Sequence, residues 1–82
     1  MRTAQEVAEA LREYVPTGDT RELRMIRDDY AGALWEDAIG AILALVERGE
    51  ISLPADLEAA AWEVVRAEEA EALRRHPVPQ TT

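Results

Sequence analysis

The sequence contains few side chains of the kinds that perform catalysis. Its one histidine, His76, stands beside Pro77, and no cysteine is present. A histidine base needs a nucleophile and an orienting partner, and neither can be identified near His76, which we interpret as a cation at a helix C-terminus. Carboxylates that are adjacent in sequence, such as Glu68 and Glu69, point to different faces of a helix. We therefore expect no enzyme, no catalytic residue, no metal site and no cofactor.

The charge of the chain is the feature that points to a partner. Its 82 residues include 17 acidic and 9 basic side chains, for a formal net charge of −8. From residue 31 to residue 65 there are seven carboxylates and one arginine, so this segment has a net charge of −6. Such a field repels nucleic acid and attracts a basic protein. Arg21, Arg24 and Arg27 recur every three residues, and we interpret them as an exposed face that exchanges weak ion pairs with nearby carboxylates.

Acidic and aromatic residues gather within one ten-residue segment. Tyr and Trp are enriched among the residues that dominate binding energy, and surrounding charge guides an oppositely charged partner. We therefore predict a partner-binding site at Asp28, Asp29, Tyr30, Trp35, Glu36 and Asp37. Whether Trp35 and Trp62 are core anchors or interface residues stays open at this point.

Capping signals predict the helices that must position this site. Thr3 and Glu6 have the spacing of a capping box, and Pro16 ends the helix that they open. Asp19 and Glu22 repeat the pattern for a second helix.

The second helix could break near Asp28-Asp29 or run on to Arg48. We expect the break, because an unbroken helix would span about 42 Å at 1.5 Å per residue, with Asp29 capping the next helix. This central helix, from about Tyr30 to Arg48, is apolar nearly all round and should be buried on more than one face. Gly40 suggests that another helix crosses closely there, and Gly49 supplies a left-handed stop. The broad core stripe contains Leu34, Trp35, Ala38, Ile39, Ile42, Leu43 and Val46.

Ser52-Leu53-Pro54 opens the last helix, because proline is tolerated in a first turn. Beyond Arg66 this helix should project into solvent, packed only by Leu73. Its predicted core stripe contains Leu57, Ala60, Ala61, Val64 and Ala67. The sequence thus predicts an all-α fold, a compact three- to four-helix bundle with a central buried helix, formed by residues 1–76 as a single domain and followed by a flexible tail of residues 77–82.

The longest apolar run is Ala38 to Val46, nine residues, whereas a membrane span needs about 20. No signal peptide is evident at Met1 to Glu6. We therefore expect a cytoplasmic protein with no membrane partner, either a monomer or a homodimer.

The stretch from Asp28 to Glu36, continued by Leu43, Leu45, Glu47 and Ile51-Ser52-Leu53-Pro54, resembles the MafI-type immunity proteins, small acidic helical proteins of bacterial polymorphic-toxin systems. The resemblance covers about half the chain. It aligns Asp29 and Tyr30 with an acidic–aromatic pair that opens a central helix, and Ala33 and Leu34 with the Ala-Leu that follows. It implies an inhibitor that neutralises a cognate toxin by occluding its active or substrate-binding surface.

Two other functions fit parts of the pattern. A phosphopantetheine carrier is also an acidic helical bundle, and it carries its attachment serine at a helix start within Asp-Ser-Leu. Ser52-Leu53 matches the last two of these residues, but Ile51 replaces the aspartate. A homodimeric structural or interaction module could instead associate through Trp62 and Val65 on the last helix.

Overall fold

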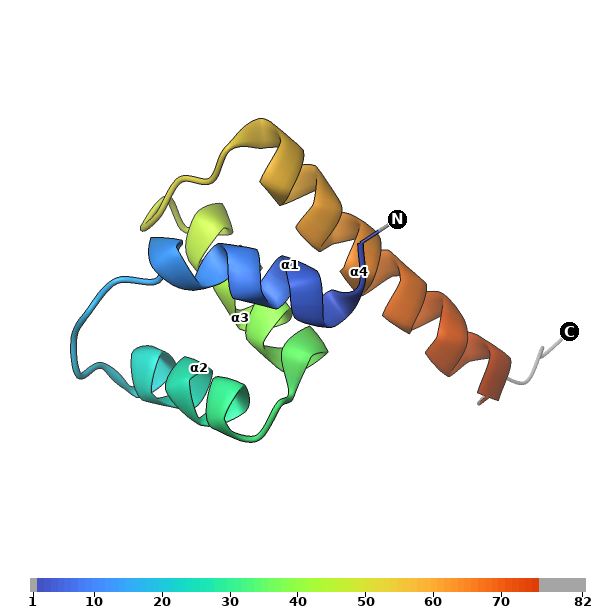
Figure 1. Cartoon of the computed structure of the whole chain (residues 1–82), viewed down its shortest axis with the longest axis horizontal. Helices are drawn as coiled ribbons and strands as arrows, with labels where there is room; N and C mark the ends of the chain where they lie inside the picture. Colours follow the sequence, from blue (N-terminus) through green and yellow to red (C-terminus); the bar gives the residue numbers. More distant parts are fainter. Residues whose placement is uncertain (1, 76–82) are drawn as a thin grey trace, which may run out of the picture.

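The computed structural model describes residues 2–75, and this part of the chain is all-helical (Figure 1). The helices are α1 (Ala4–Leu11), α2 (Arg21–Ala31), α3 (Trp35–Glu47) and α4 (Ala55–Arg75), with a short 3₁₀ helix (Arg12–Tyr14) after α1. Helix α3 packs against the other three α-helices, and α1 also packs against α4. The predicted all-α bundle with a central buried helix is therefore confirmed. His76 and the predicted tail lie outside the described residues.

One apolar core joins all four α-helices, and α3 contributes the most to it. Burying a large aliphatic side chain stabilises a fold by about 1.5–3 kcal/mol, so the central helix provides much of the driving force for folding. The buried residues are Val7, Ala8 and Leu11 on α1, Leu23 and Ile26 on α2, Ala38, Ile39, Ile42, Leu43 and Leu45 on α3, and Leu57 and Ala61 on α4.

The first helix start agrees with the sequence and the second differs from it. The Thr3 hydroxyl accepts a hydrogen bond from the Glu6 backbone N–H at 3.1 Å, and the Thr3 N–H donates to the Glu6 carboxylate at 2.9 Å. The predicted Asp19 cap is wrong: Thr20 caps α2 by accepting from the Leu23 N–H at 3.2 Å. Asp19 has another role, because it lies 3.6–3.7 Å from guanidinium nitrogens of two arginines on α2, Arg24 and Arg27.

A break between α2 and α3 is present, but it lies later than predicted. Helix α2 continues to Ala31, where the Leu34 N–H donates to the Asp29 carbonyl at 2.8 Å and the Ala33 N–H donates to the Tyr30 carbonyl at 3.2 Å. Ala33 takes the left-handed conformation (φ 56°) that this Schellman-type helix end requires. Asp29 therefore does not cap α3. It lies in the last turn of α2, where a carboxylate opposes the helix dipole.

Replacing Ala33 by glycine should stabilise the protein, because glycine adopts a left-handed conformation without the steric cost of a Cβ atom. We expect Ala33→Gly to raise the free energy of unfolding by about 0.5–1 kcal/mol, measured by urea denaturation. Gly32→Ala is the matched control: Gly32 has an ordinary φ of −90°, and an added Cβ would lie 3.4 Å from its nearest neighbour, the Asp28 carbonyl oxygen. A loss of stability in Ala33→Gly would contradict this description of the turn.

The two glycines singled out on the central helix behave differently. Gly49 ends α3 with φ +76°, and the Glu50 N–H donates to the Leu45 carbonyl at 2.9 Å, so the predicted stop is confirmed. The predicted close helix crossing at Gly40 is wrong. Gly40 is exposed, and a Cβ atom built there meets nothing within 4 Å.

Gly40→Ala should therefore stabilise α3 without any steric conflict. Alanine favours the helix interior over glycine by about 1 kcal/mol, so we expect an increase of that size in the free energy of unfolding. For a chain of this length it corresponds to a rise of about 4–8 °C in Tm. Differential scanning calorimetry measures the shift, and a lower Tm would indicate that a neighbour approaches Gly40 after all.

Helix α4 begins directly after Pro54, and its second half extends past the other helices (Figure 1). Residues 66–75 are all exposed, as predicted, but Leu73 does not anchor them, because 57% of its surface is accessible. Ala67 is also exposed, so the predicted core stripe ends at Val64. Trp62 and Val65 are half-buried against the core. No helix within residues 2–75 combines the length and apolarity needed to cross a membrane.

Candidate functional site

The late end of α2 places the predicted acidic residues on both sides of one turn. Asp28 and Asp29 occupy the last turn of α2, and Glu36 and Asp37 occupy the first turn of α3. The carboxylates of α3 suit the positive end of its dipole, whereas those of α2 lie at the unfavourable end. The turn thus brings together four carboxylates that the sequence pattern grouped only by proximity along the chain.

The pKa shifts of two carboxyl groups show that this site includes a residue of α4. The pKa of Asp29 is raised by partial burial, and then by the charges of Asp37 and Asp28. The pKa of Glu68 is raised by partial burial, and then by the charges of Glu36 and Asp37, with a smaller opposing effect from Arg75. We call these five residues (Asp28, Asp29, Glu36, Asp37 and Glu68) the acidic corner. The sequence analysis missed Glu68, because only the packing of α4 on α3 brings it there.

The arginines that form ion pairs within the described residues do so with carboxylates outside the acidic corner. Within residues 2–75, none of the five corner carboxylates lies within 4.0 Å of an arginine nitrogen. The ion pairs that are present join Arg12 to Glu9, Arg24 and Arg27 to Asp19, Arg48 to Glu50, and Arg74 and Arg75 to Glu71. Within the described residues, no ion pair therefore compensates the negative charge of the corner, and the charge of Arg75 opposes it only weakly at Glu68.

Tyr30 and Trp35 lie beside the corner, and both are half-buried. Their rings meet edge to face with centroids 6.2 Å apart. The Tyr30 hydroxyl donates to the Ala8 carbonyl at 2.5 Å, and the Arg12 guanidinium stacks over the Tyr30 ring at 4.5 Å. Tyr30 thus ties α2 to α1. Trp35 and Trp62 each pack partly against the core.

Leu34 is an exposed apolar side chain at the corner. The sequence analysis placed it in the core stripe, and this was wrong: Leu34 precedes the first turn of α3 and keeps 49% of its surface accessible. The apolar periodicity continues across the helix boundary, so the pattern alone does not reveal that Leu34 turns outward. An exposed leucine in the turn between two pairs of carboxylates is a suitable apolar contact for a partner protein.

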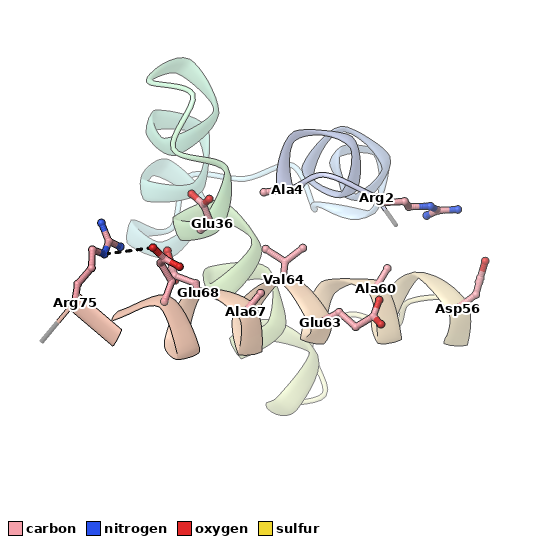
Figure 2. A pocket seen from close by; sticks show the side chains of 11 residues that line it. Arg2, Ala4, Glu36, Asp56, Ala60, Glu63, Val64, Ala67, Glu68 and Arg75 are labelled. Atoms are coloured by element: carbon pink, nitrogen blue, oxygen red, sulfur yellow. Dashed lines mark ion pairs between the residues drawn. The ribbon is translucent and has the colours of Figure 1, made fainter. Parts of the chain in front are cut away.

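A groove continues from the acidic corner along α4 (Figure 2). Its volume is about 680 Å³, and its apolar lining consists of Ala4, Ala60, Val64 and Ala67. Glu36 of α3 and Glu68 of α4 lie at the same end of it (Figure 2). Its charged lining residues are Glu36, Asp56, Glu63, Glu68 and Glu71, with Arg2 and Arg75. The acidic surface is therefore larger than the corner, and part of it is hollow.

The remaining candidate features of the sequence are the arginines of α2, the serine before the last helix and possible metal ligands. Arg24 and Arg27 are partly neutralised by Asp19, as expected for an exposed ion-pairing face. Ser52 is exposed in the connection between α3 and α4. No group of three or more His, Cys, Asp or Glu residues within residues 2–75 is arranged to hold a metal ion.

The two raised pKa values predict how stability depends on pH. A carboxyl group whose pKa is higher in the folded chain than in the unfolded chain binds more protons when folded. The free energy of unfolding therefore rises as the pH falls through the interval between these two pKa values. The intervals for Asp29 and Glu68 begin at their ordinary values of 3.8 and 4.5 and extend upward. We therefore expect the protein to become more stable as the pH falls from neutral toward 4.5, measured by urea denaturation at each pH.

The control for this prediction is the variant Asp29→Asn with Glu68→Gln. It should be more stable than the original protein at neutral pH, and its free energy of unfolding should rise much less as the pH falls. At lower pH the trend should reverse. Hydrogen bonds from the Thr3 backbone and side chain lower the pKa of Glu6 below 4.5, so the stability that Glu6 contributes is lost as the pH falls through that lowered pKa. A free energy of unfolding that decreases steadily from neutral pH would contradict the repulsion inferred at the corner.

The chain was also compared with known proteins. No protein-family model, curated protein or solved structure matches it.

Proposed function

We propose that this protein is an immunity protein that binds a basic bacterial toxin and neutralises it by occluding the active or substrate-binding surface of the toxin. The resemblance of residues 28–54 to MafI-type immunity proteins motivates the choice of a toxin as partner. The acidic corner is the surface proposed to make the contact, together with the exposed side chain of Leu34.

One observation carries this proposal: the acidic corner is a local concentration of like charge, and none of its carboxylates forms an ion pair with an arginine among residues 2–75. The pKa values of Asp29 and Glu68 are raised by partial desolvation and then by neighbouring carboxylates, which is consistent with repulsion among these charges. A cationic partner would relieve this repulsion. The free energy stored in the repulsion would then favour the complex, because it is present in the free protein and absent in the bound one.

The arrangement suits fast capture followed by slow release. A concentrated acidic surface raises the association rate with a basic partner, and exposed apolar side chains within it, such as Leu34, would slow dissociation once they are covered. The groove along α4 extends the acidic surface beyond the corner. Inhibition by steric occlusion requires no catalytic group in the inhibitor.

A growth assay tests the function directly. The neighbouring open reading frames are first searched for a large secreted protein, and its C-terminal domain is then expressed from an inducible promoter with or without the chain. We expect growth to be restored by the chain and the two proteins to co-elute as a complex in size-exclusion chromatography. Unchanged growth arrest at matched expression levels, with no complex formed by the purified proteins, would refute the proposal.

A further inference from the structure

A hollow that is open to solvent, here called the cavity, lies apart from the acidic corner, between the α1–α2 connection and the second half of α2. Its volume is about 610 Å³, which is within the usual range for small-molecule sites. Its apolar lining includes Val15, Pro16, Ile26 and the Tyr30 side chain. The charged side chains that line it are two arginines, and no carboxylate is among its lining residues. The two arginine side chains in its lining set this cavity apart from the groove along α4, whose charged lining is mostly acidic.

Both arginines are held in place by contacts that leave most of their donors unused. The Arg12 guanidinium stacks on the Tyr30 ring at 4.5 Å, and Arg27 Nη1 donates to the Gly18 carbonyl at 2.7 Å. A guanidinium has five N–H donors. Carboxylates of Glu9 and Asp19 approach Arg12 and Arg27, respectively, only to 3.6 Å, which is too far for a hydrogen bond.

We propose that this cavity binds a small monocarboxylate with an apolar chain, such as a medium-chain fatty acid. The carboxylate would accept hydrogen bonds from Arg12 and Arg27, and the chain would lie on Val15, Pro16 and the accessible part of the Tyr30 side chain. Two anchored guanidiniums lose little conformational freedom when they bind such a group. Because Glu9 and Asp19 weaken the positive field, the site favours a singly charged ligand that also makes apolar contacts over a polyanion such as a polyphosphate.

The test is a titration of the full chain, labelled with ¹⁵N, with decanoate below its micelle-forming concentration. We expect chemical-shift changes that saturate with a Kd of about 1 mM or lower and that concentrate at residues 12–17 and 26–31. Decanol has the same chain without the charge, and we expect it to bind at least about tenfold more weakly. Equal binding of the two ligands, changes centred elsewhere on the protein, or no saturable binding of decanoate would each overturn the proposal.

Variants then test the role of the arginines. Arg27→Gln should weaken decanoate binding at least about tenfold, since it removes one charge-assisted contact. Arg66→Gln, an equal change of charge on the exposed second half of α4, should leave the Kd unchanged. Decanoate binding that is equally tight in Arg27→Gln would exclude the proposed carboxylate contact. The decanol comparison uses the unaltered protein, so it decides the question even if the Arg27 variant is unstable.

Discussion

Combining Asp28→Lys with Asp37→Lys is expected to weaken the proposed complex with a basic toxin at least about 100-fold, which corresponds to about 2.7 kcal/mol of binding free energy. Both residues belong to the acidic corner, and both are exposed, so the substitutions bury no new charge. Each lysine replaces an attraction for a basic partner by a repulsion. Lysine at position 28 suits the C-terminal end of the α2 dipole, whereas lysine at position 37 is unfavourable at the N-terminal end of α3, so the two effects on stability oppose each other. Isothermal titration calorimetry measures the change in Kd.

The matched control places the same change of charge away from the corner, at Glu13→Lys with Glu47→Lys. Glu47 ends α3 at the opposite end from Glu36, about 16 Å away along the helix. The control should change the Kd less than about fivefold, and mainly through the association rate at low salt. Equal weakening by both variants would mean that only the overall charge matters and that the corner is not the binding site.

Ile42→Ala is expected to lower the free energy of unfolding by about 2–5 kcal/mol. Ile42 is fully buried on the central helix, where the lost contacts and the remaining cavity both reduce stability. A domain of 82 residues has a total stability of about 4–12 kcal/mol. The variant should therefore lose a large share of its folded population, as measured by circular dichroism during urea denaturation.

Met25→Ala is the control for this experiment. Met25 lies on α2 and keeps 54% of its surface accessible, so its truncation should cost less than about 0.5 kcal/mol. If Ile42→Ala were tolerated as well as Met25→Ala, α3 would not be the buried centre of the fold.

Local hydrogen-bonding patterns explain why much of the fold could be predicted from the sequence. The Thr3–Glu6 capping box and the Gly49 stop depend on residues within a few positions of each other, and the structure has both. The end of α2 was placed too early because the acidic pair Asp28-Asp29 looks like a helix start. Ala33 ends α2 in a left-handed conformation that alanine rarely adopts, so nothing in the residue types marked this position.

The parts of the site that could not be predicted from the sequence depend on contacts between distant segments. Glu68 joins the acidic corner only because α4 packs on α3, and no local pattern reports that packing. Tyr30 was predicted as a partner-binding residue, but its hydroxyl bonds to Ala8 on α1, a contact across 22 positions. Four of the five corner carboxylates were nevertheless predicted, because they gather at one helix junction.

Tyr30 also shows how one side chain can connect two surfaces. Its ring contacts Trp35 beside the acidic corner and lines the arginine-flanked cavity on α2. Binding in the cavity could then be detected from the corner through the fluorescence of Trp35, which gives a convenient second readout for the decanoate titration.

Carbodiimide cross-linking followed by mass spectrometry tests the central claim most directly. The reagent joins a carboxylate to a lysine that contacts it, and this chain contains no lysine, so every carboxylate–lysine link must join it to the toxin. The account predicts links from Asp28, Asp29, Glu36, Asp37 or Glu68 to lysines of the toxin. Links confined to carboxylates outside the acidic corner and the groove, such as Glu13 and Glu22, would contradict it.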